Sequence, residues 1–395
     1  MSMILAINTG SSTLKWKLYE VPSENVIAEG MVDRLGLPGS EFSSKYNGNK
    51  EKIKKDINTH EEAVTMLLNF LTEKGIVTDM NEIVGVGHRV VAGGSEYKDS
   101  VVVDDSVLQG IEDLADFAPL HNPAELAGIK SFMKILPNAK QVAVFDTSFH
   151  TTMAPENYLY SVPYEYYEKY GVRKFGAHGT SHKYVSRKAA EVLGKPIEDL
   201  KMITLHIGSG VSITAIDGGK SVDTSMGFTP LAGVTMSSRS GDIDPSLMAY
   251  LMEKEHINNP EDMIDILNHK SGLLGISGVS PDMRDLIEAK DENPKAQLAI
   301  DIFVNRIVKY VGSYVALLGG VDAMVFTAGM GENNAQIRAA ITDNFNFIGA
   351  KIDKDRNENG KGARLISSDD SKVDVMMVPT DEELMIVRDV VRLTK

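Results

Sequence analysis

Two copies of one local pattern, about half a chain apart, constrain the fold more than any other feature of this sequence. Residues 4–19 contain a buried apolar strand, a polar turn around Gly10, and a second strand in which apolar residues alternate with lysines. Residues 203–216 repeat the pattern around Gly208 and Gly210, with hydroxyl residues in place of the lysines. Each copy predicts a β-hairpin whose glycine turn, rich in backbone N–H groups, can enclose a phosphate. The repetition predicts a duplicated fold that closes on one nucleotide.

The composition limits the class of protein. The length of 395 residues predicts two domains, and 43% hydrophobic with 24% charged residues is ordinary for a globular chain. The chain carries 41 Lys and Arg against 55 Asp and Glu, a net charge of −14, so we expect neither nucleic acid nor membrane as a partner. The absence of cysteine excludes disulfides and thiol catalysis. No signal peptide or spanning segment is expected, which predicts a cytoplasmic protein.

Two charged residues come shortly after predicted buried strands. Arg89 follows the strand at 83–86, and Asp146 follows the strand at 141–145. Loops at strand ends are where α/β proteins place their sites, so both side chains are candidates for contact with a ligand. Two other interpretations stay open: Arg89 as a surface residue that packs its stem, and Asp146 as a turn-forming residue rather than one that orients a cation or binds a metal through water.

A histidine and a second arginine stand in settings that favour anions. His178 precedes a predicted helix, and helix N-termini attract negative charge through their unpaired N–H groups. His182, on the helix itself, is interpreted as structural. Arg239 lies in the long segment 223–245, which has no periodicity and is dense in Gly, Ser and Thr. Such a segment predicts a functional loop, and the guanidinium fork matches a phosphate or a carboxylate.

Two further turns favour a nucleoside. The segment 323–333 predicts a buried strand, a turn with Gly329 and Gly331, and a helix start. The two glycines leave room for a nucleoside to lie against the backbone. Asp282 and Arg284 belong to a second predicted turn, where they form an accessible pair of opposite charge.

Local rules for helix starts assign three polar residues. Asn122 is predicted to be the N-cap of a helix that continues with proline, and that role accounts for its side chain. Thr380 and Glu383 predict a capping box at the start of the terminal helix, which leaves Glu382 free to bind a cation. Residues 36–58, rich in Lys, Gly and Asn, are interpreted as a polar excursion.

Nine segments together resemble the acetate kinase family, nearly from end to end of the chain. That family belongs to the superfamily of acetate and sugar kinases, heat-shock chaperones and actin. The segments are NTGSSTLKWKLYE at 8–20, GHRVVAGG at 87–94, APLHNP at 118–123, FDTSFH at 145–150, GAHGTSHKYV at 176–185, DTSMGFTPL at 223–231, SRSGDIDP at 238–245, FTAGMGEN at 326–333 and PTDEEL at 379–384.

The resemblance implies an α/β fold of two duplicated actin-like, or ribonuclease H-like, domains. Each would hold a mixed β-sheet flanked by helices, with the nucleotide site in the cleft between them. Residues 1–150, completed by the C-terminal helix 384–395, would form the N-terminal domain. Residues 151–383 would form the C-terminal, nucleotide-binding domain.

The resemblance also implies an activity and its ligands. The expected reaction is the reversible, direct in-line transfer of the ATP γ-phosphoryl group to acetate, which gives acetyl phosphate and ADP. Mg²⁺ is the expected cofactor, with Mn²⁺ as an alternative, and the expected assembly is a homodimer, for which the tyrosine-rich stretch 155–175 would suit an interface.

Site residues are carried over position by position. The implied metal ligands are Asn8 and Glu382. The implied catalytic residues are Arg89, Asp146, His178 and Arg239, the last two as stabilisers of the transition state. The residues implied to bind acetate are Arg89, Val91, Leu120 and Pro230. The residues implied to bind the nucleotide are Ser11, Ser12, Lys15, His206, Gly208, Ser209, Gly210, Asp282, Met283, Arg284, Gly329, Gly331, Glu332 and Asn333.

Departures from the family pattern keep alternatives open. Ala177 stands where phenylalanine is common, and a smaller side chain in the acyl pocket would relax selectivity toward propionate. Ser209 stands where the family has asparagine in the second hairpin turn. The first alternative is therefore a kinase for propionate or another short-chain carboxylate. The second is an actin-like or chaperone-like ATPase, although Arg89 and Arg239 suit a small anionic acceptor better.

Overall fold

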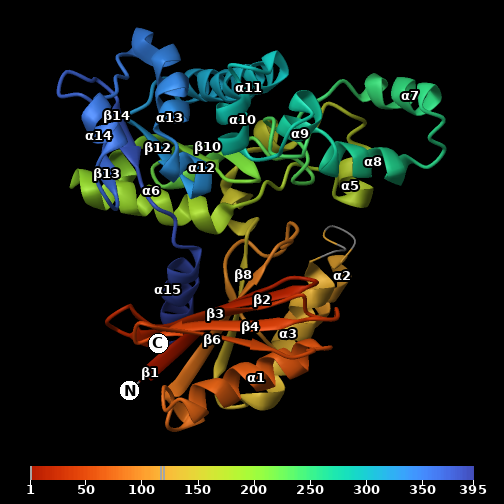
Figure 1. The fold of residues 1–395 in the computed structure, drawn as a ribbon, viewed down its shortest axis with the longest axis vertical. Helices are drawn as coiled ribbons and strands as arrows, with labels where there is room; N and C mark the ends of the chain where they lie inside the picture. Colours follow the sequence, from red (N-terminus) through yellow and green to blue (C-terminus); the bar gives the residue numbers. More distant parts are fainter. Residues whose placement is uncertain (1, 116–117, 119–120) are drawn as a thin grey trace. The chain divides into compact units, whose positions relative to one another are not determined.

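The computed structural model describes residues 2–115, 118 and 121–395. The chain divides into two compact units. The first comprises Met1–Phe149 and Asp381–Lys395, and the second comprises His150–Thr380. The C-terminal helix α15 (Glu382–Thr394) therefore belongs to the N-terminal unit, where it packs against three of that unit's strands, β1, β6 and β8 (Figure 1).

In the described part of the first unit, eight strands form one mixed sheet in the order β5-β4-β3-β2-β1-β6-β8-β7. The strands are β1 (Ser2–Thr9), β2 (Thr13–Val21), β3 (Asn25–Asp33), β4 (Glu41–Tyr46), β5 (Asn49–Lys54), β6 (Ile83–Val90), β7 (Val101–Val102) and β8 (Lys140–Phe145). The predicted hairpin of β1 and β2 is confirmed, with Thr9 opposite Leu14 at its turn. Strands β6 and β8 run parallel to β1, so all three end at the same edge of the sheet.

The interpretation of residues 36–58 as a polar excursion was wrong, because this stretch contains β4 and β5. These strands are polar on the solvent side, which hid their alternation in the sequence. On the inner side, Phe42 is fully buried and stacks on Trp16 with ring centroids 6.1 Å apart. One well-packed aromatic residue is therefore enough to anchor a strand whose other residues are mostly polar.

The second unit repeats the first. In its described residues six strands lie in the order β11-β10-β9-β12-β14-β13. They are β9 (Lys201–Ile207), β10 (Val211–Asp217), β11 (Lys220–Thr224), β12 (Ala323–Thr327), β13 (Arg364–Leu365) and β14 (Asp374–Met377). Order and direction match β3-β2-β1-β6-β8-β7: two antiparallel pairs, two parallel pairs, and an antiparallel edge. The predicted second hairpin, of β9 and β10, and the duplicated α/β fold are confirmed.

Helices cover both sheets. Those of the first unit are α1 (His60–Glu73), α2 (Asp105–Asp113), α3 (Asn122–Ile135) and α15. Those of the second are α4 (Pro155–Tyr158), α5 (Glu165–Tyr170), α6 (Gly179–Leu193), α7 (Pro245–Lys254), α8 (Pro260–His269), α9 (Gly272–Ser277), α10 (Met283–Ala289), α11 (Pro294–Leu318), α12 (Ala328–Asn333), α13 (Ala335–Thr342) and α14 (Lys354–Glu358). In Figure 1 the sheet of the second unit runs between α6 and α11, which contact its central strands. None of the described helices combines the length and apolar character needed to cross a membrane.

Candidate active site

The first unit brings three of the predicted site residues together at the edge where β1, β6 and β8 end. Arg89 donates from Nε and Nη2 to Asp146 Oδ2 at 2.9 and 2.5 Å, and from Nη1 to Asn8 Oδ1 at 3.4 Å. Asp146 is only 1% exposed. Burial alone would lower the pKa of Arg89, but nearby carboxylates, Asp146 foremost, outweigh it and raise that pKa. Arg89 is thus a fixed cation with a defined orientation.

Asn122 does not cap helix α3, contrary to the sequence-based expectation. The N-cap position belongs to His121, which makes no side-chain cap bond. The buried Asn122 side chain instead accepts from Ala92 N and donates to Ala92 O, both at 3.2 Å. The loop after β6 needs partners for its buried backbone groups, and an amide side chain offers both a donor and an acceptor. This tertiary demand outweighs the local preference for capping.

Glu125, one turn further along α3, was missed in the sequence. Its Oε2 accepts from Val91 N at 3.0 Å, and its Oε1 has no hydrogen-bond partner in the described structure. Burial raises the pKa of Glu125 to about 8, against the opposing effect of the Arg89 charge. Asn122 and Glu125 therefore clamp the loop that carries the predicted acetate residue Val91. Leu120, also predicted to bind acetate, lies outside the described residues.

The predicted capping box of Thr380 and Glu383 is wrong. Asp381 is the N-cap of α15 and accepts from Leu384 N at 3.0 Å, whereas the Thr380 hydroxyl pairs with Ser181 Oγ at 2.8 Å. Asp381 was overlooked because Thr380 and Glu383 fit the spacing of a capping box.

The Glu382 carboxylate is free of cap bonds, as expected, and it has no hydrogen-bond partner among the described residues. Burial, followed by the charge of Asp146, raises the pKa of Glu382 to about 7.

The first hairpin carries the three remaining residues predicted for the first unit. Ser11 and Ser12 form the turn, where Ser12 O accepts from Leu35 N at 2.8 Å. Lys15 lies on β2 directly across the hairpin from Asn8, and it is one of the charges that act on Glu382. Backbone and lysine groups therefore share this end of the sheet with Arg89.

In the second unit His178 sits immediately before α6, as predicted. Its backbone is in the left-handed region with φ 56°, a conformation that non-glycine residues adopt rarely and that is concentrated at functional sites. Its Nδ1 lies 2.9 Å from Ser212 Oγ, and its ring stacks on that of His206 with centroids 4.0 Å apart. The predicted phosphate residue His206 thus fixes one face of the ring.

Arg239, on the loop 223–245, approaches the His178 ring beside Gly210. A Cβ atom added at Gly210 would lie 3.4 Å from both Arg239 Nη1 and His178 Nε2, so the two nitrogens converge beside the second hairpin turn. Arg239 Nη1 also donates to the carbonyl of Pro230, the predicted acetate residue, at 3.2 Å. Among the described residues Arg239 forms no ion pair, and burial lowers its pKa without opposition. A half-buried guanidinium without a carboxylate is a site for an anion.

The predicted nucleotide residues fall into two groups. In the first, Gly208 and Ser209 belong to the second hairpin turn, and a Cβ at Gly329 would meet nothing within 4 Å. In the second, side chains are engaged with backbone. Glu332 Oε1 accepts from Ala328 N at 2.9 Å and from Thr380 N at 3.1 Å, and Asn333 donates to Gly329 O at 2.8 Å. Glu332 and Asn333 therefore shape the glycine turn.

Arg338 on α13 braces the same turn and was missed in the sequence. Its buried guanidinium donates to Gly331 O at 2.9 Å and to Glu332 O at 2.8 Å. Burial lowers its pKa to about 10. An arginine among apolar helix residues was the only signal for this role.

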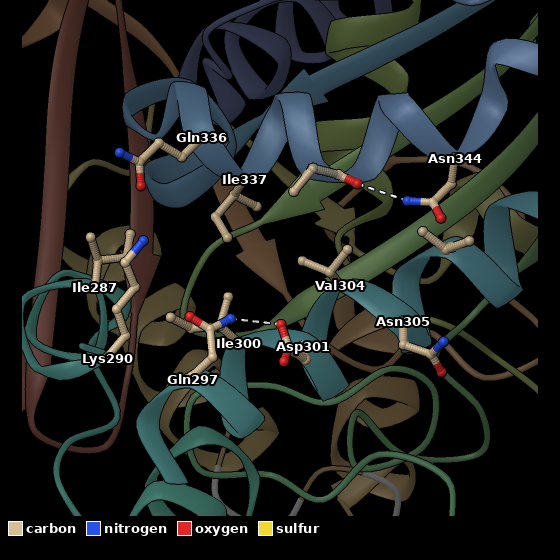
Figure 2. A pocket seen from close by; sticks show the side chains of 12 residues that line it. Ile287, Lys290, Gln297, Ile300, Asp301, Val304, Asn305, Gln336, Ile337 and Asn344 are labelled. Carbon is tan, nitrogen blue, oxygen red and sulfur yellow. Dashed lines mark hydrogen bonds between the residues drawn. The ribbon is translucent and has the colours of Figure 1, made fainter. Parts of the chain in front are cut away.

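A cavity of about 380 Å³ opens among α10, α11 and α13 (Figure 2). Apolar side chains of all three helices point into it, among them Ile287, Ile300 and Ile337. The predicted residues Asp282, Met283 and Arg284 stand at the start of α10: Met283 is buried, and Arg284 Nη2 donates to Asp282 Oδ2 at 2.6 Å.

Comparison with known proteins identifies the family of this chain. Residues 3–388 match the Acetokinase family. The chain belongs to this family. It is 61% identical over 394 residues to "Acetate kinase 1" of Latilactobacillus sakei subsp. sakei (strain 23K), with 100% of both chains covered.

Solved structures of the family agree. The acetate kinase of Porphyromonas gingivalis is 44% identical with a TM-score of 0.95, and a propionate kinase from Francisella tularensis subsp. tularensis SCHU S4 is 40% identical with a TM-score of 0.92. Both matches cover 100% of each chain.

Proposed function

We propose that this protein is an acetate kinase, which transfers the γ-phosphoryl group of ATP reversibly and directly to acetate to give acetyl phosphate and ADP. Membership of the Acetokinase family supports the reaction class. The observation that carries the proposal in this chain is Arg239, a half-buried cation with no carboxylate partner in the described structure, beside His178 and the glycine turn at Gly210. Phosphoryl transfer needs such positive charge and N–H donors around the three equatorial oxygens.

The nucleophile needs no general base. A carboxylate has an unperturbed pKa of about 4, so acetate is ionised at neutral pH. We therefore assign Asp146 the role of orienting Arg89, to which it accepts two hydrogen bonds, rather than the role of accepting a proton. Arg89 binds the acetate carboxylate, because its guanidinium is fixed in place and stays protonated. The family resemblance assigns Val91, Pro230 and Leu120 to the methyl group of acetate.

The donor set of the first unit fits a magnesium ion. Mg²⁺ prefers oxygen ligands and takes only one or two from a protein when it also binds phosphates and water. Asn8 Oδ1 and the Glu382 carboxylate are such oxygens, and the raised pKa of Glu382 is what a bound cation would reverse. Mg²⁺, or Mn²⁺ in its place, supplies charge neutralisation on the phosphate oxygens when bound. Lys15, Ser11 and Ser12 stand nearby to contact the same phosphates.

The second unit is proposed to bind the nucleotide. His206, Gly208, Ser209 and Gly210 line the phosphates, where a serine hydroxyl replaces the longer amide of the family pattern. The adenosine lies at the turn of Gly329 and Gly331, where the backbone at Gly329 is open, next to the Asp282–Arg284 pair. The cavity of Figure 2 beside α10, lined by apolar and polar side chains alike, is available to the base.

We further propose a cytoplasmic homodimer. The aromatic stretch of α5 supports the dimer, because Tyr164 and Tyr170 are 58% and 65% exposed, and exposed tyrosines are typical of interfaces.

The test is formation of acyl phosphate, trapped as the hydroxamate, from ATP and Mg²⁺ with acetate, propionate and butyrate in parallel. We expect the highest kcat/KM with acetate. The comparison of the three acids also tests the effect of Ala177, which stands where phenylalanine is common in the family. Its side chain is buried in the core of the second unit, and its carbonyl accepts from His150 Nε2 at 2.9 Å. Equal or better use of propionate would change the substrate but not the mechanism. ATP hydrolysis without any acyl phosphate would favour an actin-like ATPase instead.

A further inference from the structure

A buried chain of hydrogen bonds leads from the interior of the second unit to the His178 ring. Ser212 Oγ, on β10, lies 2.9 Å from His178 Nδ1 and 2.7 Å from His182 Nε2. The other nitrogen of His182, Nδ1, lies 2.7 Å from Thr204 Oγ1 on β9. Thr204, His182 and Ser212 are each 0% exposed. Three side chains from β9, α6 and β10 thus form one chain that ends on His178.

The protons of this chain can be assigned by asking where each one goes. Burial, followed by the neighbouring rings of His150 and His206, lowers the pKa of His182 well below its usual value, so this ring is neutral and carries one N–H. If that proton sat on Nδ1, Thr204 would accept it, and the hydroxyl proton of Thr204 would have no acceptor among the described residues. A buried donor without a partner costs about 1–3 kcal/mol. That arrangement is disfavoured.

The opposite arrangement satisfies every donor. Thr204 donates its hydroxyl proton to His182 Nδ1, and His182 Nε2–H donates to Ser212 Oγ. Ser212 then has its own proton left, and it donates that proton to His178 Nδ1. Because Nδ1 accepts, the single proton of a neutral His178 must lie on Nε2.

We propose that Thr204, His182 and Ser212 are positioning residues that hold His178 as the tautomer protonated on Nε2. Nε2 is the atom beside Gly210 and Arg239 Nη1. His178 is therefore an N–H donor there without a second proton. The proposal rests on the proposed function only for what this donor meets, the oxygens of the transferring phosphoryl group.

The groups around His178 agree with a neutral donor. His206 stacks on one face of the ring, and two hydrogen bonds through Ser212 connect His178 to His182. Arg239 is the charged group that faces Nε2 across Gly210, and its positive charge disfavours a second cation at this point. A neutral ring that still donates meets the phosphoryl group without this repulsion.

The decisive measurement is the ¹⁵N spectrum of histidine-labelled protein, without ligands and at mildly alkaline pH. We expect His178 to carry its proton on Nε2 and His182 to do the same, with the signals assigned by comparison with His178→Asn and His182→Asn. A proton on Nδ1 of His178 would overturn the proposal. This readout does not depend on activity, so it separates failure of the tautomer assignment from failure of the proposed function.

Variants then test whether the chain matters for turnover. Ser212→Ala and Thr204→Val remove one hydroxyl each, and we expect kcat to fall on the order of tenfold with the KM values for acetate and ATP little changed. Thr204→Ser keeps the hydroxyl and should restore the wild-type kcat. A loss that is equal in Thr204→Ser and Thr204→Val contradicts the proposal.

Discussion

The two units have the same sheet but use equivalent strand ends differently. In the first unit the ends of β6 and β8 are joined by side chains, because Asp146 accepts both hydrogen bonds of the Arg89 fork. In the second unit the ends of β12 and β14 are joined through backbone, because Glu332 accepts from Ala328 N and Thr380 N. In both units a carboxylate links the two strand ends by accepting hydrogen bonds. Among the described residues, the first unit places the Arg89 guanidinium at this edge, whereas the second places the turn of Gly329 and Gly331 there.

The two arginines show the same contrast. Arg89 is paired with a buried carboxylate, so its orientation is fixed and part of its charge is neutralised. Arg239 is held only by the carbonyl of Pro230 and the sulfur of Met236 within the described structure. The duplicated scaffold therefore holds one arginine that is paired with a carboxylate and one that has no carboxylate partner among the described residues. The predictions that follow test this difference.

The largest effects are expected from the arginines. Arg89→Ala and Arg239→Ala should each lower kcat on the order of 10³-fold in the hydroxamate assay, because each removes a donor from the reacting anions. Stability should separate them. Arg89→Ala removes the guanidinium that donates two hydrogen bonds to the buried Asp146 carboxylate and should lower the free energy of unfolding by about 3–5 kcal/mol, whereas Arg239→Ala breaks no ion pair of the described residues.

Urea denaturation of both variants measures that separation. Arg89→Ala combined with Asp146→Asn provides the control, because it also removes the carboxylate charge of Asp146. This double variant should recover stability without recovering activity. Equal stability of the two single variants would refute the contrast between a paired and an unpaired arginine.

The next effect tests whether His178 and Arg239 truly converge. A methyl group at Gly210 would lie 3.3 to 3.4 Å from both side chains and would push them by a few tenths of an ångström. Gly210→Ala should therefore lower kcat by about tenfold with unchanged stability. Gly312→Ala, in the middle of α11, is the matched control: nothing lies within 4 Å of the added atom, and the helix gains about 0.5–1 kcal/mol. A fully active Gly210→Ala protein would contradict the shared site.

Local patterns predicted much of this molecule. Both hairpins and the strand ends at Arg89 and Asp146 follow from alternation, turn residues and chain direction, which act over a few residues. The family resemblance supplied the rest of the site. The hydrogen bonds of Arg89 with Asp146 and Asn8 then emerge because parallel strands end together.

What the sequence did not predict depends on partners far along the chain. Asn122 fits the N-cap rule, yet its amide bonds to Ala92, 30 residues away. Thr380 fits a capping box, yet its hydroxyl bonds to Ser181, 199 residues away. Arg338 and Ser212 have no local pattern at all, because their roles arise only when separate elements pack around a turn or a ring. Side-chain hydrogen bonds to partners far along the chain override local capping preferences wherever burial removes water as the alternative partner.

Glu125 should make stability depend on pH. Its pKa is raised to about 8 in the folded protein against about 4.3 when unfolded, so the folded state binds the extra proton between these values. Stability contributed by Glu125 is therefore lost as the pH rises through this window. Glu125→Gln removes the titration and should be more stable than the wild type by a few kcal/mol above the window, and equal to it below. Urea midpoints at both ends measure the difference, and Glu61→Gln on the exposed side of α1 is the control. An unchanged pH profile in Glu125→Gln would show that the carboxyl ionises freely.

The smallest effect distinguishes a cap from a clamp at Asn122. Aspartate is as good an N-cap as asparagine, so Asn122→Asp would cost almost nothing if the side chain capped α3. In the structure the amide also donates to Ala92 O, and an aspartate lacks that donor. We expect Asn122→Asp and Asn122→Ala to lower the free energy of unfolding by similar amounts, about 1–3 kcal/mol each, because either leaves buried backbone groups of Ala92 unpaired. The KM for acetate should rise in both, since Ala92 adjoins Val91 in the loop that α3 holds. A stable Asn122→Asp protein with a normal KM would restore the capping role of Asn122.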